Sequence, residues 1–431
     1  MCILYIELGV VFLYLTRAIT WKKSLPVFLD IFKHDKSVSG ERLVSHKKAF
    51  LSSVAATVGI GNIAGVGTAI HLGGPGALFW MWVSAMFGMI FRMCSTYMAL
   101  KLRPESSKAP TFATPMVYLE KYMKGIWSFI PPLVAGLILV QGVVLYNMVQ
   151  ANALAHAVHN RFHVPNAIIA VFITLAIAMV ILGGLKKIVD YCSALAPFVI
   201  VIYVLTGLAV LLFNPLSAVS ALGEVFHHAF LPYSIVGGVT GYTVLQAMQF
   251  GVSRGVFSHM SGMGTSPFYQ AANNDSPAKG AFMAAVTPFV DTIIICSVTG
   301  LVILSVPNWQ HQTGAHLTAA AYEAGIGFSG QIIVVVSLIL FALTTIAGFA
   351  HIAERCYRYL GGSNLYYFRL VFLAVTFSGP FLHIGFVWSL SDIIIAALIV
   401  FHLIPLLYIT LLNRKVMVKD LQALADETTK A

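Results

Sequence analysis

The sequence is poor in charged residues. Of its 431 residues only 10% are Asp, Glu, Lys or Arg, whereas soluble domains carry about 25%. Hydrophobic residues make up 58%, and the interior of a soluble protein of this length could not hide so much apolar surface. The scarcity of charge therefore excludes an ordinary water-soluble domain and predicts an integral membrane protein.

Cysteines are also few and widely spaced. None forms a C-x-x-C pair; they are Cys2, Cys94, Cys192, Cys296 and Cys356. We expect no disulfide framework, metal cluster or cofactor. The formal net charge is +10, but the basic residues form short clusters between apolar runs. That pattern indicates membrane topology and not binding to nucleic acid.

Apolar runs long enough to cross about 30 Å of hydrocarbon recur along the chain. We count eleven, at 2–20, 48–71, 75–101, 128–156, 164–183, 189–213, 234–254, 280–306, 327–353, 366–385 and 388–412. Each must be helical, because a chain in lipid has to satisfy its own backbone hydrogen bonds. The sequence therefore predicts an all-α membrane fold of eleven transmembrane helices.

The distribution of basic residues predicts the orientation. With the N-terminus outside, 25 of the 26 Lys and Arg residues fall in inner segments, and Arg161 is the exception. The outer loops 214–233 and 307–326 contain none. This asymmetry follows the positive-inside rule. It predicts a multi-pass protein of the cell membrane with a cytoplasmic C-terminus.

A glycine-rich stretch, Ala55–Gly65, lies in the middle of the second span. Three glycines and Asn62 within seven residues weaken a helix, and such a break is tolerated in a membrane only where it lines a protein cavity. The exposed N–H groups would suit a carboxylate and the exposed carbonyls a small cation. Close helix packing through Gly61-x-x-x-Gly65 explains the same pattern equally well.

A second cluster, Gly237–Gly241, opens the seventh span, five spans after the first cluster. An odd offset gives the two halves opposite orientations, and matching interruptions in inverted repeats indicate a transporter's central site. We therefore predict an extra N-terminal helix with a cytoplasmic connection, two inverted five-helix repeats and a cytoplasmic tail. Their bounds are 1–47, 48–213, 214–412 and 413–431.

Two short stretches match the sequence patterns of enzyme motifs but lack the structural context that those motifs require. Gly59–Ala64 fits G-x-G-x-x-A, and Gly251–Gly255 fits G-x-S-x-G. The first lacks a preceding strand and a ribose-binding acid, and the second lacks the alternating strands and helices that build a nucleophile elbow. We predict that the chain is not an enzyme.

Six strings, in this order, resemble the alanine or glycine:cation symporter family. They are Ala56–Gly65, Gly73–Trp82, Asn147–Asn152, Ser253–Ser258, Asp291–Cys296 and Phe341–Thr345. The resemblance implies two inverted five-helix repeats of the leucine-transporter type. It also implies sodium-coupled symport of a small neutral amino acid such as alanine or glycine. Partners would be that amino acid, Na⁺ and membrane lipid, and a monomer is plausible.

We expect the substrate carboxylate at the backbone N–H groups of Ile60 and Gly61, with the Asn62 amide facing substrate or ion. Acceptors for the substrate ammonium are expected on the second cluster and on the fourth span: Gly237, Gly238, Thr240 and Gln150. The resemblance supports Gln150, although an interhelical hydrogen bond would also explain it.

Sodium requires several oxygen ligands without strict geometry. The carbonyls of Ala55 and Val58 with the hydroxyls of Thr344 and Thr345 fit that need, and the family string supports the two threonines. A threonine in a membrane helix more often bonds its own backbone. Phe349 lies one turn from Thr345 and is expected to wall the pocket.

Asp291 is expected to be buried in the eighth span, where an unpaired carboxylate is costly. A structural bond to the broken helices is favoured over ion coupling or a proton relay. The chain departs from the family at His259-Met260 and at Ser95, where the family carries acids. The alternatives are therefore a same-fold transporter using protons or another solute, and a non-translocating amino-acid sensor.

Overall fold

The computed structural model describes residues 1–33, 46–104, 114–182, 184–232, 243–270, 276–307 and 309–430. Helices joined by short turns make up these ranges, and no strand occurs in them. The helices before the first break are α1 (Cys2–Leu15), α2 (Ile19–Lys33) and α3 (His46–Thr57). Those that follow, up to the long α10, are α4 (Ala64–Gly73), α5 (Gly76–Lys101), α6 (Met116–Tyr122), α7 (Ile130–Val140), α8 (Asn147–Phe162), α9 (Asn166–Ile181) and α10 (Gly184–Phe213).

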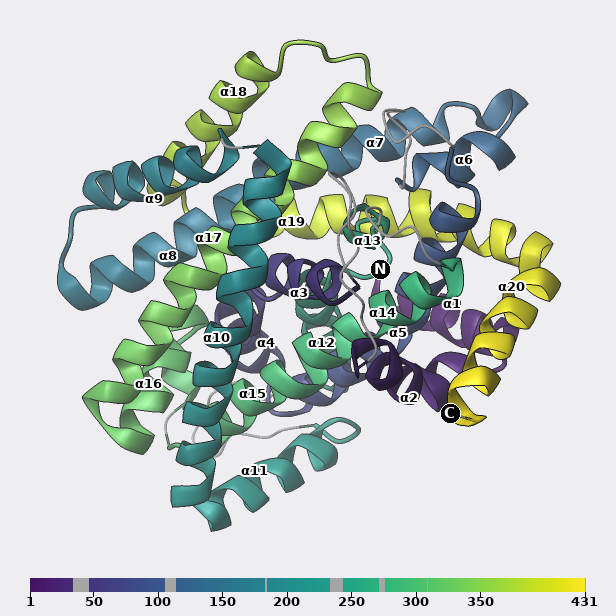
Figure 1. The fold of residues 1–431 in the computed structure, drawn as a ribbon. Coiled ribbons are helices and arrows are strands. Elements are labelled where there is room, and N and C mark those ends of the chain that lie inside the picture. Colours follow the sequence, from purple (N-terminus) through teal and green to yellow (C-terminus); the bar gives the residue numbers. More distant parts are fainter. Residues whose placement is uncertain are drawn as a thin grey trace.

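The second half of the described chain also consists of helices joined by short turns (Figure 1). Its helices are α11 (Pro215–His228), α12 (Val244–His259), α13 (Pro267–Gln270), α14 (Pro277–Pro288), α15 (Ser297–Leu304), α16 (Gly314–Ile326), α17 (Phe328–Tyr359), α18 (Leu365–Ser378), α19 (Ile384–Leu398) and α20 (Ile404–Lys430). Short 3₁₀ turns are η1 (Ile60–Asn62), η2 (Gly125–Trp127), η5 (Trp309–His311) and η6 (Gly379–Phe381), and π turns are η3 (Gln141–Tyr146), η4 (Phe289–Cys296) and η7 (Ile399–Leu403).

The expected count of eleven spans is not confirmed. Five helical stretches of the described chain are long and apolar enough to cross a membrane: Gly76–Lys101, Gly125–His159, Pro277–Leu304, Phe328–Tyr359 and Gly385–Thr428. Two bent pairs raise the number to seven; α1 turns into α2 by 74°, and the second half of α10 turns into α11 by 104°. Shorter apolar helices and the interrupted segment α3–η1–α4 make length alone a poor guide to the number of crossings.

Local sequence explains several helix ends. Gly74 has φ 72°, a left-handed conformation that ends α4 and lets Pro75 start α5. At the start of α12, Thr243 and Gln246 form a reciprocal capping box. The π turns η3 and η4 interrupt otherwise continuous helices, and such bulges are frequent at functional sites.

The centre of the bundle holds the interrupted segment. Helices α5 and α12 pack against each other and against α4, while α10 and α17 pack on α3. In Figure 1, α3 and α4 lie between α10 and α12, and the yellow α20 runs along one edge beside α2. The core packing therefore encloses η1 from several sides.

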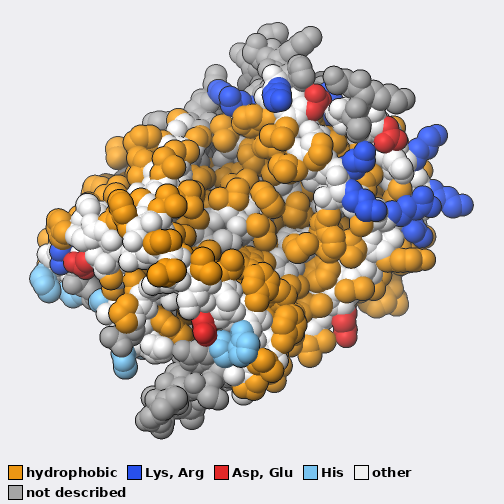
Figure 2. Space-filling model, turned by 90° about the horizontal axis from the view of Figure 1, so that it is seen from below, with side chains coloured by type: hydrophobic (Ala, Val, Ile, Leu, Met, Phe, Trp, Pro, Cys, Tyr) orange, Lys and Arg blue, Asp and Glu red, His pale blue; other side chains and the backbone are white. Residues whose placement is uncertain are grey.

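Much of the outside is hydrophobic. Figure 2 shows a face covered mainly by apolar side chains, with Lys and Arg gathered towards one side. Strongly exposed residues include Phe213, Leu216 and Val219, at 73%, 86% and 71% exposure. Apolar surface on this scale suits contact with lipid and not with water.

Candidate substrate and ion site

The first glycine-rich stretch is interrupted in the structure. Helix α3 ends at Thr57, a single 3₁₀ turn covers Ile60–Asn62, and α4 starts at Ala64. Gly59 is fully extended, with φ −152° and ψ −151°. The helical hydrogen-bond ladder therefore stops over residues 59–63, inside the protein core.

The interruption frees backbone groups at the end of α3. The Gly59 N–H, which would continue the helix onto the Ala55 carbonyl, donates to Asn62 Oδ1 at 2.9 Å. The Asn62 N–H donates to the Gly59 carbonyl, whereas in a continuous α-helix it would donate to the Val58 carbonyl. Within the described residues, the Gly61 N–H makes no hydrogen bond. The break thus presents carbonyls and an N–H that the helix does not use.

Gln150 on α8 contacts the break directly. Its Oε1 accepts a hydrogen bond from the Ile60 N–H at 3.0 Å, and its buried Nε2 has no hydrogen-bond partner in the described structure. The structure therefore brings together Ile60, Gly61 and Gln150. It also shows that Gln150 already occupies one N–H that the sequence analysis assigned to a carboxylate.

Asn62 and Asp291 hold the break in place. The Asn62 amide donates to Asp291 Oδ1 and to the Asp291 carbonyl, each at 2.9 Å. The other carboxylate oxygen accepts hydrogen bonds from Ser258 at 2.9 Å and Thr292 at 2.8 Å. All these groups are buried. Asp291 lies in the π turn η4, so this bulge carries the carboxylate that joins η4 to the first break and to α12.

One of the two predicted threonines reaches the break. Thr345 Oγ1 on α17 donates to the Val58 carbonyl at 3.2 Å. Thr344 Oγ1 bonds the carbonyl of Phe341 on its own helix, as threonines in membrane helices commonly do. On the other side, Thr318 of α16 donates to the Ile63 carbonyl at 2.9 Å. Val58 and Thr345 therefore form the most direct contact among the expected sodium ligands.

Phe349 belongs to an aromatic stack beside the break. Its ring stacks on Tyr146 with centroids 4.1 Å apart, and Tyr146 stacks in turn on Phe257 at 4.9 Å. The Tyr146 hydroxyl donates to the Phe257 carbonyl at 2.8 Å. Helices α17, η3 and α12 thus meet through three rings, and Phe349 forms an apolar wall at this level.

A second interruption follows α12. This helix ends at His259, and Met260, Gly262 and Gly264 all have positive φ, of 54°, 90° and 75°. Buried side chains cover the freed carbonyls: His402 contacts that of Gly262, and Thr265 donates to that of Met260. Residues Gly237, Gly238 and Thr240, where we expected the second break, lie outside the described residues.

Sequence reasoning missed this break, although a signal was present. The string Ser261-Gly-Met-Gly264 resembles the first glycine cluster in composition, and glycine favours the positive φ found here. The first break also packs against the last turn of α12. A Cβ at Gly61 would lie 2.8 Å from the Cα of Ser258 on α12, so only glycine permits this approach.

A buried arginine joins the two broken helices. Arg92 on α5 donates to the carbonyl of His259, at the end of α12, and to the Ser53 hydroxyl on α3, both at 2.9 Å. His259 Nε2 contacts Ser84 at 3.1 Å. A guanidinium therefore lies at a helix C-terminus, the end that carries partial negative charge.

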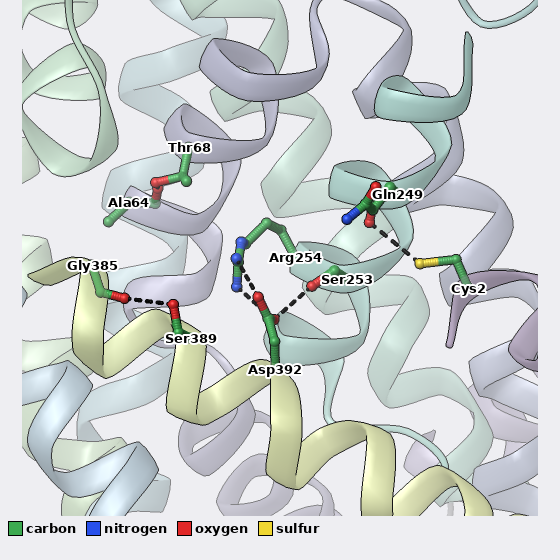
Figure 3. Close-up of polar contacts among 9 residues, drawn as sticks. All are labelled: Cys2, Ala64, Thr68, Gln249, Ser253, Arg254, Gly385, Ser389 and Asp392. Carbon is green, nitrogen blue, oxygen red and sulfur yellow. Dashed lines mark hydrogen bonds and ion pairs between the residues drawn. The ribbon is translucent and has the colours of Figure 1, made fainter. Parts of the chain in front are cut away.

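A second arginine is paired in the C-terminal half of α12 (Figure 3). Arg254 and Asp392 form a two-point ion pair, with distances of 2.8 and 3.1 Å. Ser253 donates to the same carboxylate at 2.8 Å. The Arg254 guanidinium lies 4.3 Å from the centre of the Trp388 ring, and that ring contacts Phe257. This cluster links α12 to α19.

No group of three or more His, Cys, Asp or Glu side chains that could hold a metal ion occurs in the described ranges. The arrangement instead offers neutral oxygens, one carboxylate and the Gly61 N–H at a break that packs against the last turn of α12 in the core. This is the architecture of a secondary active transporter, in which half-helix ends bind substrate and ion.

The chain belongs to the sodium:alanine symporter family, whose model matches residues 1–430. It is 35% identical over 420 residues to the sodium/alanine symporter AgcS of Methanococcus maripaludis, covering 95% of this chain and 91% of that protein. It is 28% identical over 391 residues to a sodium/proton-dependent alanine carrier protein of Bacillus sp. PS3, covering 86% of each.

Solved structures show the same fold. A Na⁺-coupled sialic acid symporter in its substrate-bound outward-open state matches 97% of this chain and 84% of its own, with a TM-score of 0.52 and 11% identity. MhsT in complex with L-phenylalanine matches 89% of this chain and 100% of its own, with a TM-score of 0.57 and 13% identity. The protein is thus a multi-pass secondary transporter with the leucine-transporter fold, and its family is a family of transporters and not an enzyme class.

Proposed function

We propose that this transporter couples the uptake of a small neutral amino acid, alanine or glycine, to sodium by alternating access. The observation that carries the proposal is the contact of Val58 and Thr345 beside the free N–H of Gly61. It places oxygens suited to a cation next to a donor suited to a carboxylate. Family membership and the similarity to the sodium/alanine symporter AgcS support the same substrate and ion.

The substrate carboxylate binds the Gly61 N–H and displaces Gln150 Oε1 from the Ile60 N–H. Once displaced, the Gln150 Oε1 is an acceptor for the substrate ammonium, and its buried Nε2, which has no partner in the described structure, can donate to the substrate carboxylate. Phe349 limits the space for the substrate side chain. Gly237, Gly238 and Thr240 remain candidate acceptors for the ammonium.

Sodium binds the carbonyls of Ala55 and Val58 and the hydroxyl of Thr345, with Thr344 as a further ligand after rotation of its hydroxyl. Bound sodium fixes the end of α3 and so favours the broken conformation that receives the amino acid. Coupling is then a difference in sodium affinity with and without substrate. Asn62 and Asp291 act by positioning the break, because their polar atoms bind each other.

We also propose that the N-terminus is outside and the C-terminus cytoplasmic, with the repeat bounds given above. Arg92 and Arg254 lie within α5 and α12, so their positions do not indicate which side of the membrane a loop faces. Most of the other basic residues in the described ranges lie on helices, four of them on α20. That helix runs from Ile404 to Lys430 without interruption, across the predicted boundary of the tail.

Uptake into proteoliposomes tests the proposal. Purified protein should accumulate radiolabelled alanine or glycine when sodium is higher outside and should not respond to a pH gradient without sodium. Uptake driven by the pH gradient alone would support a proton-coupled transporter of the same fold. Saturable alanine binding without counterflow would support a sensor. Either result contradicts sodium symport.

A further inference from the structure

A pocket of about 220 Å³ lies at the end of the bundle where α8 ends and α17 begins. Side chains of α8, α16 and α17 line it. Its walls are mostly small or apolar and include Ala157, Ala319, Val335 and Leu338. The volume is below the ~300–1,000 Å³ of sites for drug-sized ligands, so the pocket suits a small molecule.

Three polar side chains, those of Arg161, His316 and Gln331, interrupt this apolar lining, and the His316 ring already contacts Gln312 at 3.1 Å. Arg161 is held by its ring contact with Phe328, 4.7 Å from the ring centre, and its guanidinium makes no hydrogen bond in the described part of the chain. Gln331 Oε1 is buried and has no hydrogen-bond partner there. Arg161 offers donors to a carboxylate, whereas Gln331 offers an acceptor to an ammonium.

The pocket lies in line with the central site. Ala157 is seven residues, or two helical turns, from Gln150 on α8. Leu338 is seven residues from Thr345 on α17. Each pair therefore lies on one helix face, about 10 Å apart along the axis. The third wall, α16, also supports the break, because Thr318 bonds the Ile63 carbonyl.

We propose that this pocket is a second binding site for a zwitterionic amino acid with a small apolar side chain. The carboxylate binds Arg161, the ammonium binds Gln331, and the side chain packs on Ala157 and Ala319. The substrate class rests on the proposed function. Substrate occupies this pocket before or after it occupies the central site. Because α8 and α17 line the pocket, a bound substrate contacts the same two helices that carry Gln150 and Thr345.

Thiol labelling of the full-length chain in detergent tests the proposal. Ala319→Cys places a thiol in the pocket wall, and a small methanethiosulfonate reagent should label it faster than the chain without the added cysteine. Alanine at ten times its Kd should slow this labelling about tenfold by mass action. Propionate, which lacks the ammonium, should protect less. Val219→Cys, exposed on α11, should be labelled without protection by either compound.

Variants identify the site that gives protection. Arg161→Gln should abolish protection by alanine, and Gln331→Leu should reduce it to the level of propionate. Arg358→Gln, the same charge change at the other end of α17, should leave protection intact. Gln150→Leu should also leave it intact while abolishing uptake. Protection that is absent, that survives Arg161→Gln, or that is lost with Gln150→Leu would overturn the second site.

Failure of the proposed function has a different outcome. If wild-type protein shows no sodium-driven uptake but alanine still protects Ala319→Cys in a manner that depends on Arg161, the pocket binds an amino acid and the symport mechanism is wrong. If uptake depends on sodium but protection is absent, the symport mechanism stands and the pocket is not a substrate site.

Discussion

Arg254 on α12 and Asp392 on α19 are joined by two hydrogen-bonded contacts, of 2.8 and 3.1 Å. The arginine side chain is 4% exposed, whereas the aspartate is 38% exposed. A charge that is almost completely buried therefore depends on a carboxylate at the protein surface. Because Trp388 and Phe257 continue this contact to the aromatic stack, the pair holds α19 against the end of α12 that leads to the second break.

Asp392→Asn should destabilise the protein by about 1–3 kcal/mol, less than the ~3–5 kcal/mol for breaking a fully buried pair, because Asp392 is partly solvated. The measurement is thermal unfolding of the purified protein in detergent. Arg358→Gln is the control, since its partner Glu354 also binds Arg369 and the arginine is 50% exposed. An equal shift for the two variants would show that Arg254 does not depend on Asp392.

Gly61→Ala should reduce alanine uptake by about tenfold or more, because overpacking costs ~1–3 kcal/mol and the new Cβ would lie 2.8 Å from the Ser258 Cα. Gly65→Ala is the matched control on the same segment, since a Cβ there meets its nearest atom at 3.9 Å. Initial rates in proteoliposomes, normalised to reconstituted protein, provide the comparison. Normal uptake by Gly61→Ala would contradict a requirement for the close approach of Gly61 to α12.

Thr345→Ala should raise the sodium concentration for half-maximal uptake about tenfold, the loss expected for one oxygen ligand worth ~1–1.5 kcal/mol. Thr345→Ser keeps the hydroxyl and should restore most of the affinity. Thr344→Ala should have a smaller effect, because its hydroxyl bonds the carbonyl of Phe341. The sodium dependence of uptake at fixed alanine distinguishes the three variants, and an unchanged curve for Thr345→Ala would rule out this ion site.

Asp291→Ala should destabilise the protein strongly, since it leaves the buried donors of Asn62, Ser258 and Thr292 without their acceptor, at ~1–3 kcal/mol for each unsatisfied group. Thr292→Val removes one of these hydrogen bonds and should have a smaller effect. Thermal unfolding in detergent measures both, and uptake by the folded fraction shows whether Asp291 also has a transport role. A small shift for Asp291→Ala would contradict the positioning role.

The sequence by itself determined that most of the chain lies in lipid, because scarce charge and long apolar runs leave no alternative. Three glycines around Asn62 marked the second span as either interrupted or closely packed, and the structure shows the interruption. Charge content and glycine spacing are local properties, so no tertiary contact is needed to read them. The six family strings, in their fixed order, indicated a transporter. They too are read from the sequence without any tertiary contact.

Only the tertiary structure decided which groups meet. Glycine composition did not show that the described break after α12 lies at Met260–Ser266, since several clusters of similar composition compete and packing selects among them. The bond from Gln150 to Ile60 and the bridge of Arg92 between Ser53 and His259 join residues far apart in the chain. Such contacts depend on how helices stack, because a buried polar group takes the partner that packing places within reach.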